Sequence, residues 1–198
     1  MKKSILTAVC IIVFALSVSA QAPAPFSLYA GGALSLPNAP DGFKDTFKTG
    51  YHGLVGLGYK MGPGFQLVGK VEYHKFSYDF GYVGISGVDG GDSKLWMFGG
   101  DGRFAFGLPA APIKPFAFAG AGIANIKQSD FGGNLTLASS ITPSFPESQN
   151  KVYYNLGAGV EFKAGPSFNL FVQGRYVSIA TEGDNTTFIP ITVGLKFF

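Results

Sequence analysis

The sequence predicts an all-β protein, an eight-stranded antiparallel up-and-down transmembrane β-barrel. Three observations predict this fold class: an apolar export signal, eight stretches that alternate apolar and polar residues, and connections that are alternately long and short. Period-two alternation is typical of strands whose two faces meet different surroundings, and no helical period follows residue 20. Short turns at one end and long loops at the other are typical of barrels that cross a membrane.

Residues 1–20 have the form of a secretory signal peptide. A basic start is followed by an apolar run over residues 5–17 and by a small-x-small sequence at 18–20. The run is too short to span a bilayer as a helix. We therefore expect cleavage after residue 20, which leaves residues 21–198 as a single outer-membrane β-barrel domain.

The composition of the expected mature chain suits a protein that is solvated partly by lipid. Removing Lys2 and Lys3 leaves 13 basic and 12 acidic residues, a net charge of +1. No stretch concentrates basic residues, so we expect no nucleic-acid partner. Aromatic residues make up 15% of the chain and charged residues only 14%. The single cysteine, Cys10, lies in the signal, so stability must come from burial and hydrogen bonds.

The first four strands are expected at 26–36, 51–61, 65–76 and 94–107. Each keeps its apolar side chains on one parity, namely Phe26, Leu28, Leu34, Leu36, Tyr51, Val55, Leu57, Tyr59, Phe65, Leu67, Val71, Tyr73, Trp96, Phe98, Phe104 and Phe106. The opposite parity carries Ser27, Tyr29, Ser35, His52, Lys60, Gln66, Lys70, Glu72, His74, Asp101 and Arg103. One face of each strand is therefore expected to meet lipid and the other to line the lumen.

The last four strands are expected at 115–127, 151–163, 168–178 and 189–197. Their apolar parity carries Phe116, Phe118, Ile126, Val152, Tyr154, Leu156, Val160, Phe162, Leu170, Val172, Tyr176, Ile189, Ile191, Val193, Leu195 and Phe197. The opposite parity of the middle strands carries Asn125, Lys127, Asn155, Glu161, Gln173 and Arg175. By the same reasoning, the first set is expected to face lipid and the second the lumen.

The connections predict the topology. Those at 62–64, 108–114 and 164–167 are tight and rich in Gly and Pro, whereas those at 37–50, 77–93, 128–150 and 179–187 are longer and more polar. Strands of about 10–13 residues match the ~9–11 residues of a tilted membrane strand. A soluble exported lipocalin-like binding barrel is the alternative, with its aromatic parity around a ligand. Aromatic residues near both ends of the strands favour the membrane barrel.

Several segments resemble a known family: Lys114-Pro115-Phe116, Gly120-Ala121-Gly122, Leu156 to Phe162, Gly174-Arg175-Tyr176 and Ile189 to Phe198. On these segments the chain resembles the small outer-membrane β-barrel family, the OmpA/OmpX-like group, without a periplasmic domain. The resemblance covers essentially the whole mature chain. It implies location in the cell outer membrane, contact with outer-membrane lipid and lipopolysaccharide, and insertion by the barrel-assembly machinery. Phe197 and Phe198 resemble the assembly signal, although Phe198 is out of step with the apolar parity.

The inward parity predicts a polar network in the lumen. Its expected members are Lys70, Glu72, Asp101, Arg103, Asn155, Glu161, Gln173 and Arg175, with three positive and three negative charges. An eight-stranded barrel is only wide enough for side chains, and charges there must be paired. We therefore expect a salt-bridged plug, and the alternative is a gated path through the same residues.

Strand register predicts two further contacts. A turn that pairs Met61 with Phe65 sets His52 opposite His74 near the external mouth, with Cβ atoms ~4.5–5.5 Å apart. Such a pair could share a metal or a proton. Because two ligands do not make a metal site, we expect no metal and no cofactor. In the same way, a turn that pairs residues 162 and 168 sets Asn155 opposite Arg175.

These observations predict a non-enzymatic function. No set of Ser, His and acidic residues converges on one rim, so we expect no catalytic residue; a lipid-A-modifying enzyme or surface protease would need His52, His74 or a rim carboxylate. We expect a monomer with a structural or surface-interaction role, whose long external loops, above all 128–150, meet an unknown external ligand. The alternative is a small gated pore for ions or apolar solutes.

Overall fold

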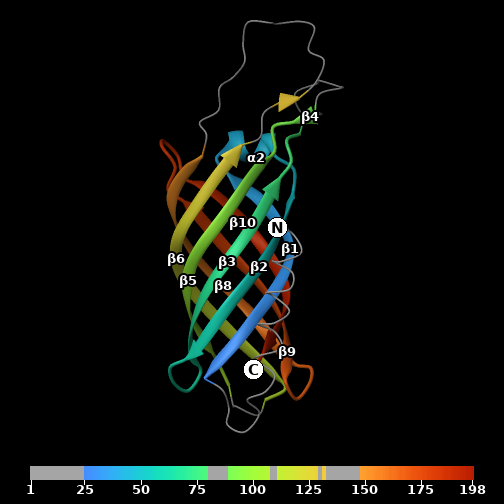
Figure 1. Ribbon diagram of the computed structural model, residues 1–198, viewed down its shortest axis with the longest axis vertical. Coiled ribbons are helices and arrows are strands. Elements are labelled where there is room, and N and C mark those ends of the chain that lie inside the picture. Colours follow the sequence, from blue (N-terminus) through green and yellow to red (C-terminus); the bar gives the residue numbers. More distant parts are fainter. Residues whose placement is uncertain (1–24, 80–88, 108–110, 129–130, 133–147) are drawn as a thin grey trace, which may run out of the picture.

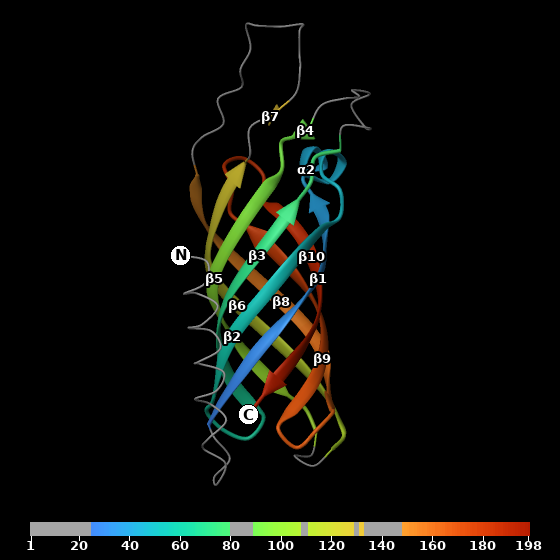
Figure 2. The ribbon, with the colours of Figure 1, turned by 45° about the vertical axis from the view of Figure 1, so that its right-hand side comes forward.

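The computed structural model describes residues 25–79, 89–107, 111–128, 131–132 and 148–198. Within these ranges eight strands close into one antiparallel barrel, in the order β1-β10-β9-β8-β6-β5-β3-β2 (Figures 1 and 2). The barrel strands are β1 (Phe26–Ala39), β2 (Gly50–Lys60), β3 (Phe65–Phe76), β5 (Ser93–Ala105), β6 (Ile113–Gln128), β8 (Gln149–Lys163), β9 (Phe168–Ile179) and β10 (Thr186–Phe197). The predicted fold class is confirmed. The expected signal peptide lies outside the described residues and stays a prediction.

Short and long connections lie at opposite ends of the barrel, as expected. The tight turns after β2 and β8 lie at the lower end in Figure 1, which is the periplasmic end of the expected topology. At the upper, external end lie a short helix, α2 (Asp41–Thr46), and a small ladder of β4 (Asp89–Gly90) with β7 (Phe131–Gly132) (Figure 2). In the part of the chain that the structure describes, no helix has the length and apolar character that a membrane crossing requires.

The outer surface of the barrel is apolar on every strand. Exposed large side chains there include Phe26, Leu34, Tyr51, Val55, Leu67, Val71, Trp96, Phe98, Ile113, Ile123, Val152, Leu156, Leu170, Val172, Ile191 and Val193. The charged parity points inward instead, with Glu72 and Arg175 buried. A soluble lipocalin-like barrel requires the reverse arrangement, so that alternative is wrong. A continuous apolar surface of this kind needs a nonpolar solvent.

On β6 the two faces are the reverse of the prediction. Phe116 and Phe118 were expected to face lipid, but both are buried in the lumen, with exposed fractions of 2% and 4%. Ile126 likewise packs against the internal apolar cluster. Ile123 and Lys127 are exposed on the outer face instead. The aromatic rings are needed inside because they cover buried cations of neighbouring strands, as described below.

The predicted register between β8 and β9 is wrong by two residues. Phe162 was expected to pair with Phe168, but the turn takes in Phe168, whose carbonyl accepts a hydrogen bond from the Gly165 amide at 3.0 Å. Phe162 therefore pairs with Leu170, two residues later on β9, and Asn155 lies opposite Val177 rather than Arg175. A slip of two residues leaves every side chain on its own face. The prediction of inward and outward faces on these strands consequently survives the error.

Candidate functional site

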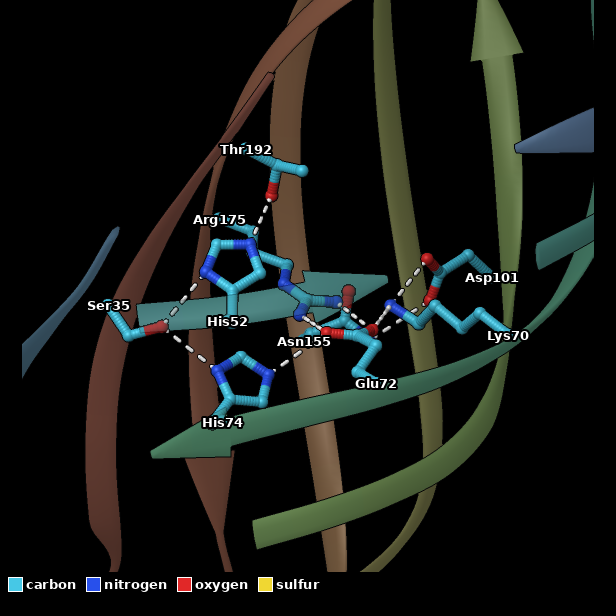
Figure 3. A network of polar contacts seen from close by, with 9 residues as sticks. All are labelled: Ser35, His52, Lys70, Glu72, His74, Asp101, Asn155, Arg175 and Thr192. Carbon is cyan, nitrogen blue, oxygen red and sulfur yellow. Dashed lines mark hydrogen bonds and ion pairs between the residues drawn. The ribbon is translucent and has the colours of Figure 1, made fainter. Parts of the chain in front are cut away.

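A buried polar network crosses the middle of the lumen (Figure 3). We call it the midbarrel network; its members are Ser35, His52, Lys70, Glu72, His74, Asp101, Asn155, Arg175 and Thr192, all buried. They come from seven of the eight barrel strands, because each strand turns alternate residues inward. On β3 this alternation sends residues 70, 72 and 74 into the lumen one above another. The network therefore ties together parts of the chain that are far apart in sequence.

Ion pairs form the centre of this network. Arg175 donates from both terminal nitrogens to Glu72, with Nη1 lying 2.7 Å from Oε1. Lys70 Nζ lies 3.1 Å from Glu72 Oε1 and 2.7 Å from Asp101 Oδ2. Asn155 donates to the other oxygen of Asp101 at 3.0 Å. Two cations thus face two carboxylates, which is the condition under which buried charges are tolerated.

A glycine makes room for the central arginine. Arg175 lies opposite Gly157 in the ladder between β8 and β9. A Cβ atom at position 157 would lie 2.6 Å from Arg175 Cβ and 2.5 Å from the ring of Phe118, closer than atoms can approach. Any side chain at Gly157 would therefore displace the guanidinium from Glu72 or the ring beside it.

The two histidines extend the network toward β1 and β10. The register sets His52 opposite His74, as expected, and their rings stack with centroids 4.9 Å apart. The pair was expected near the external mouth, but both rings are buried, and His74 lies against the buried rings of Phe76 and Phe188. Ser35 Oγ lies between them, 3.1 Å from His52 Nδ1 and 2.9 Å from His74 Nδ1. His52 Nε2 reaches Thr192 Oγ1 at 2.9 Å, and His74 Nε2 reaches Glu72 Oε2 at 3.1 Å.

One arrangement of protons satisfies this whole chain with both imidazoles neutral. The Thr192 hydroxyl donates to His52, His52 to Ser35, Ser35 to His74, and His74 to Glu72, so every ring nitrogen is used. Neither ring then has a free nitrogen for a metal. In the described residues, no group of three or more His, Cys, Asp or Glu is placed to hold a metal ion.

A second network lies nearer the periplasmic end of the lumen. We call it the periplasmic network; its members are Tyr29, Gln66, Arg103, Glu161, Asn169 and Lys196. Glu161 is its centre: it accepts from Arg103 at 2.6 Å and from Asn169 at 2.5 Å, and Lys196 Nζ lies 3.3 Å away. Two cations share one carboxylate here, so this network carries a net charge of +1.

Aromatic rings complete the surroundings of Arg103. The centre of its guanidinium lies 3.6 Å from the ring centroid of Phe116 and 5.2 Å from that of Tyr29. The Tyr29 hydroxyl in turn donates to Gln66 Oε1 at 2.5 Å. Cations bind the faces of aromatic rings, and desolvation strengthens the interaction. This contact is the physical reason why β6 turns Phe116 inward rather than toward lipid.

The lumen between the two networks is almost filled. A cavity of about 20 Å³ remains, lined by Tyr29, Leu54, Val68, Lys70, Asp101, Arg103, Phe118, Phe171 and Gln173. A space of this size holds about one water molecule. The described part of the lumen therefore has the character of a packed core.

The external end of the lumen is apolar. Its buried cluster consists of Phe76, Leu95, Met97, Ala124, Tyr153, Val177, Ile179 and Phe188, with Phe43 and Phe47 packed against it from α2 and its C-cap. A hollow of about 220 Å³ lies above this cluster, lined by Phe43, Phe47, Ser93, Leu95, Ile126, Gln128, Gln149, Thr181 and Thr186. The hollow is therefore lined by both apolar and polar side chains.

The residues expected in one lumen network divide between two. Lys70, Glu72, Asp101, Asn155 and Arg175 belong to the midbarrel network, Arg103 and Glu161 to the periplasmic network, and Gln173 lines the cavity. Besides the histidine pair, six members were not in the expected network: Ser35, Tyr29 and Gln66, which had been named on the inward parity, and Thr192, Asn169 and Lys196, which had not. All six stand on the inward parity of their strands, so a count of parity extended over β9 and β10 would have found the other three.

Comparison with known proteins identifies the family. A family model described as an outer membrane protein beta-barrel domain matches residues 6–197. The chain belongs to this family. Membership places it in the outer membrane, which agrees with the apolar outer surface and with the resemblance to OmpA-like barrels. The comparison with curated proteins found no match.

Solved outer-membrane barrels share the fold. Neisserial surface protein A (NspA) is 18% identical, with a TM-score of 0.64, and the match covers 89% of this chain and 99% of that one. A major outer membrane protein from Thermus thermophilus is 12% identical with a TM-score of 0.56, covering 87% and 97%. Ail, the attachment invasion locus protein of Yersinia pestis, is 17% identical with a TM-score of 0.51, also covering 87% and 97%. These likenesses establish an outer-membrane barrel fold.

The last two residues close the barrel at its periplasmic end. Phe197 pairs with Leu28 and Phe168 on its two sides, and its ring lies 6.3 Å from that of Phe168. Phe198 follows the strand, is exposed, and donates its amide to the Ser167 carbonyl at 3.1 Å. Their role as a signal to the assembly machinery stays a prediction.

Proposed function

We propose that this outer-membrane barrel is a closed, non-catalytic protein that acts through its external end, in contact with outer-membrane lipid and lipopolysaccharide and with an external ligand. One observation carries the proposal: the described lumen is filled and leaves a cavity of only about 20 Å³. It is filled by the two ion networks, by the apolar cluster at the external end, and by a second apolar cluster of Tyr29, Leu54, Val68, Phe116, Phe118 and Phe171. Such an interior supports the barrel rather than transporting a solute.

The ion pairs in the lumen count against the alternative of a gated pore. An ion path through the middle would have to separate Arg175 and Lys70 from Glu72, which has an exposed fraction of 1%. Breaking a buried pair costs about 3–5 kcal/mol. The apolar cluster at the external mouth would have to open as well.

Burial also counts against catalysis. Glu72, His74 and Ser35 form a hydrogen-bonded series of the residue types found in hydrolytic triads. All three have exposed fractions of 0–1%, and the cavity in the lumen does not reach Ser35 or His74. A nucleophile needs room for a reacting atom beside it. These groups are better explained as a structural hydrogen-bond chain.

The external end has the features of a recognition surface. It carries the longer connections, the exposed α2 and the hollow lined by Phe43 and Phe47. Aromatic side chains beside polar ones are typical of binding surfaces. Most of the connection from 128 to 150, expected to matter most, lies outside the described residues.

Planar-bilayer conductance of the refolded protein tests this proposal. Wild type should show no discrete channel currents, and Arg175→Met should lower stability without creating them. Heat modifiability on unboiled and boiled gels would show that each sample is folded. Channel currents in wild type that change with Glu72 or Arg175 substitutions would instead make the protein a pore and overturn the proposal.

A further inference from the structure

Three lysines lie side by side on the outer face of the barrel, at its external border. In the ladders, Lys75 of β3 lies opposite Lys94 of β5, and Lys94 lies opposite Lys127 of β6. All three stand on the outward parity of their strands, which on β6 is the parity that the sequence had assigned to the lumen. Directly opposed residues have Cβ atoms about 4.5–5.5 Å apart. We call Lys75, Lys94 and Lys127 the lysine row.

The row carries more positive charge than its neighbours neutralise. Lys75 Nζ pairs with Asp92 Oδ2 at 2.6 Å. Among the side chains that the structure describes, no carboxylate pairs with Lys94 or Lys127. Like charges directly opposite one another destabilise a sheet. Two adjacent opposed pairs of lysines are therefore a local cost to folding unless an anion lies between them.

The position of the row indicates where such an anion comes from. Two residues along each strand toward the middle of the barrel lie Tyr73, Trp96 and Asn125, and two residues further lie Val71, Phe98 and Ile123. The Tyr73 and Trp96 rings contact each other with centroids 5.0 Å apart. The outer face thus passes from cations to aromatic rings and then to apolar side chains within four residues. Aromatic belts mark the level of the lipid headgroups.

We propose that the lysine row binds the phosphate groups of a phosphorylated lipid in the outer leaflet, with the acyl chains lying along Phe98 and Ile123. Lysine is a common phosphate ligand because its ammonium is a compact charge with three donors. Its aliphatic stem can lie on apolar surface while its charged head reaches the headgroup. The lysine row thus binds the phosphate groups, and the apolar side chains beside it on the same face bind the acyl chains. This proposal deepens the lipid partnership proposed above and names the face that makes it.

Native mass spectrometry of the mature protein in a zwitterionic detergent tests the proposal, with a diphosphorylated lipid A as the probe. The test variant is Lys94→Gln with Lys127→Gln. The matched control is Lys60→Gln with Lys163→Gln, two exposed lysines at the periplasmic end. The test variant should bind the lipid about tenfold or more weakly than wild type, and the control should bind within about twofold of it.

The chemistry of the probe separates the sources of binding. The same lipid with its phosphates removed should bind wild type about tenfold more weakly. Inorganic pyrophosphate should not displace the lipid, because it lacks the acyl chains. Equal loss in the control variant, equal binding of the dephosphorylated lipid, or displacement by pyrophosphate at matched concentration would each overturn the proposal, as would unchanged binding by the test variant.

Thermal unfolding gives a second readout that a merely structural role would not produce. In zwitterionic detergent alone, the test variant should unfold at the same or a higher temperature than wild type, because both repulsive lysine pairs are gone. With diphosphorylated lipid A added, wild type should gain stability and the variant should not. A variant that is equally destabilised with and without the lipid would contradict a lipid site. Bilayer conductance tests whether the barrel is closed, whereas lipid binding and thermal unfolding test the lysine row. Either proposal can therefore be overturned without the other.

Discussion

The two polar networks of the lumen both compensate buried charges, but they do so with different partners. In the midbarrel network, two cations meet two carboxylates, and each carboxylate is further bonded by a polar side chain, Asn155 or His74. In the periplasmic network, two cations share Glu161, and aromatic rings cover the remaining charge of Arg103. The side chain of Lys196 is 15% exposed there, whereas that of Arg175 is 1% exposed.

The difference shows that a charged side chain needs more complete pairing the deeper it lies in the barrel. At the middle of the barrel no bulk water is available, so charges must balance one for one and polar atoms need bonds. Near the open end, an uncompensated charge can be shared between an aromatic face and solvent. Three glutamates at increasing exposure, each changed to glutamine, would measure this gradient directly.

The largest effect is expected for Glu72→Gln. The change keeps the size of the side chain but removes the charge that Arg175 and Lys70 share, leaving two buried cations with Asp101 alone. We expect a loss of about 3–5 kcal/mol in the free energy of unfolding. Urea titration of the protein refolded into lipid vesicles would measure it. Where that variant does not fold, Glu72→Asp should give a smaller loss that can be measured.

A smaller effect is expected for Glu161→Gln. The amide can still accept from Arg103 and Lys196, and both cations keep other stabilising contacts, Arg103 with Phe116 and Lys196 with solvent. We expect a loss of about 2 kcal/mol, as for hydrogen bonds to a charged group. The same urea titration applies. A loss equal to that of Glu72→Gln would show that depth and the number of partners do not set the cost.

The smallest effect is expected for Glu182→Gln, on the external connection between β9 and β10. Lys151 Nζ lies 2.8 Å from Glu182 Oε1, but the side chain of Glu182 is 92% exposed. The hydrogen bond from Lys151 lowers the pKa of Glu182 in the folded protein. Any stabilisation is therefore present at neutral pH and lost as the pH falls through that lowered pKa.

Exposed pairs of this kind often contribute nothing measurable. We therefore expect the urea midpoint of Glu182→Gln to match that of wild type at pH 7 and at pH 4. A clear loss at pH 7 that disappears at pH 4 would show that the external connection is held more tightly than its exposure indicates.

Much of the fold followed from alternation alone. The faces of β6 were wrong because alternation is ambiguous there, and the register of β8 with β9 was wrong because it depends on the turn. On β3, polar residues at 70, 72 and 74 stand against apolar residues at 71 and 73, so the inward face was unmistakable. On β6, aliphatic and small residues occur on both parities and the only two aromatic residues share one, so Phe116 and Phe118 were assigned to the wrong face. The candidate site was predicted where charge marked the inward face. Ser35 was assigned to the inward parity but, like Thr192, was left out of the expected network because it carries no charge.

The sequence by itself determined the number of barrel strands and the alternation of short and long connections. For most strands it also determined which face meets lipid and which lines the lumen, because a period of two is a local property of the chain. Only the tertiary structure decided which charges meet. A two-residue slip between β8 and β9 preserves every face yet changes every partner, so pairing depends on turn geometry rather than on pattern. Closure of the barrel decided the rest: it turned Phe116 inward to cover Arg103, and it brought Lys127 out beside Lys94.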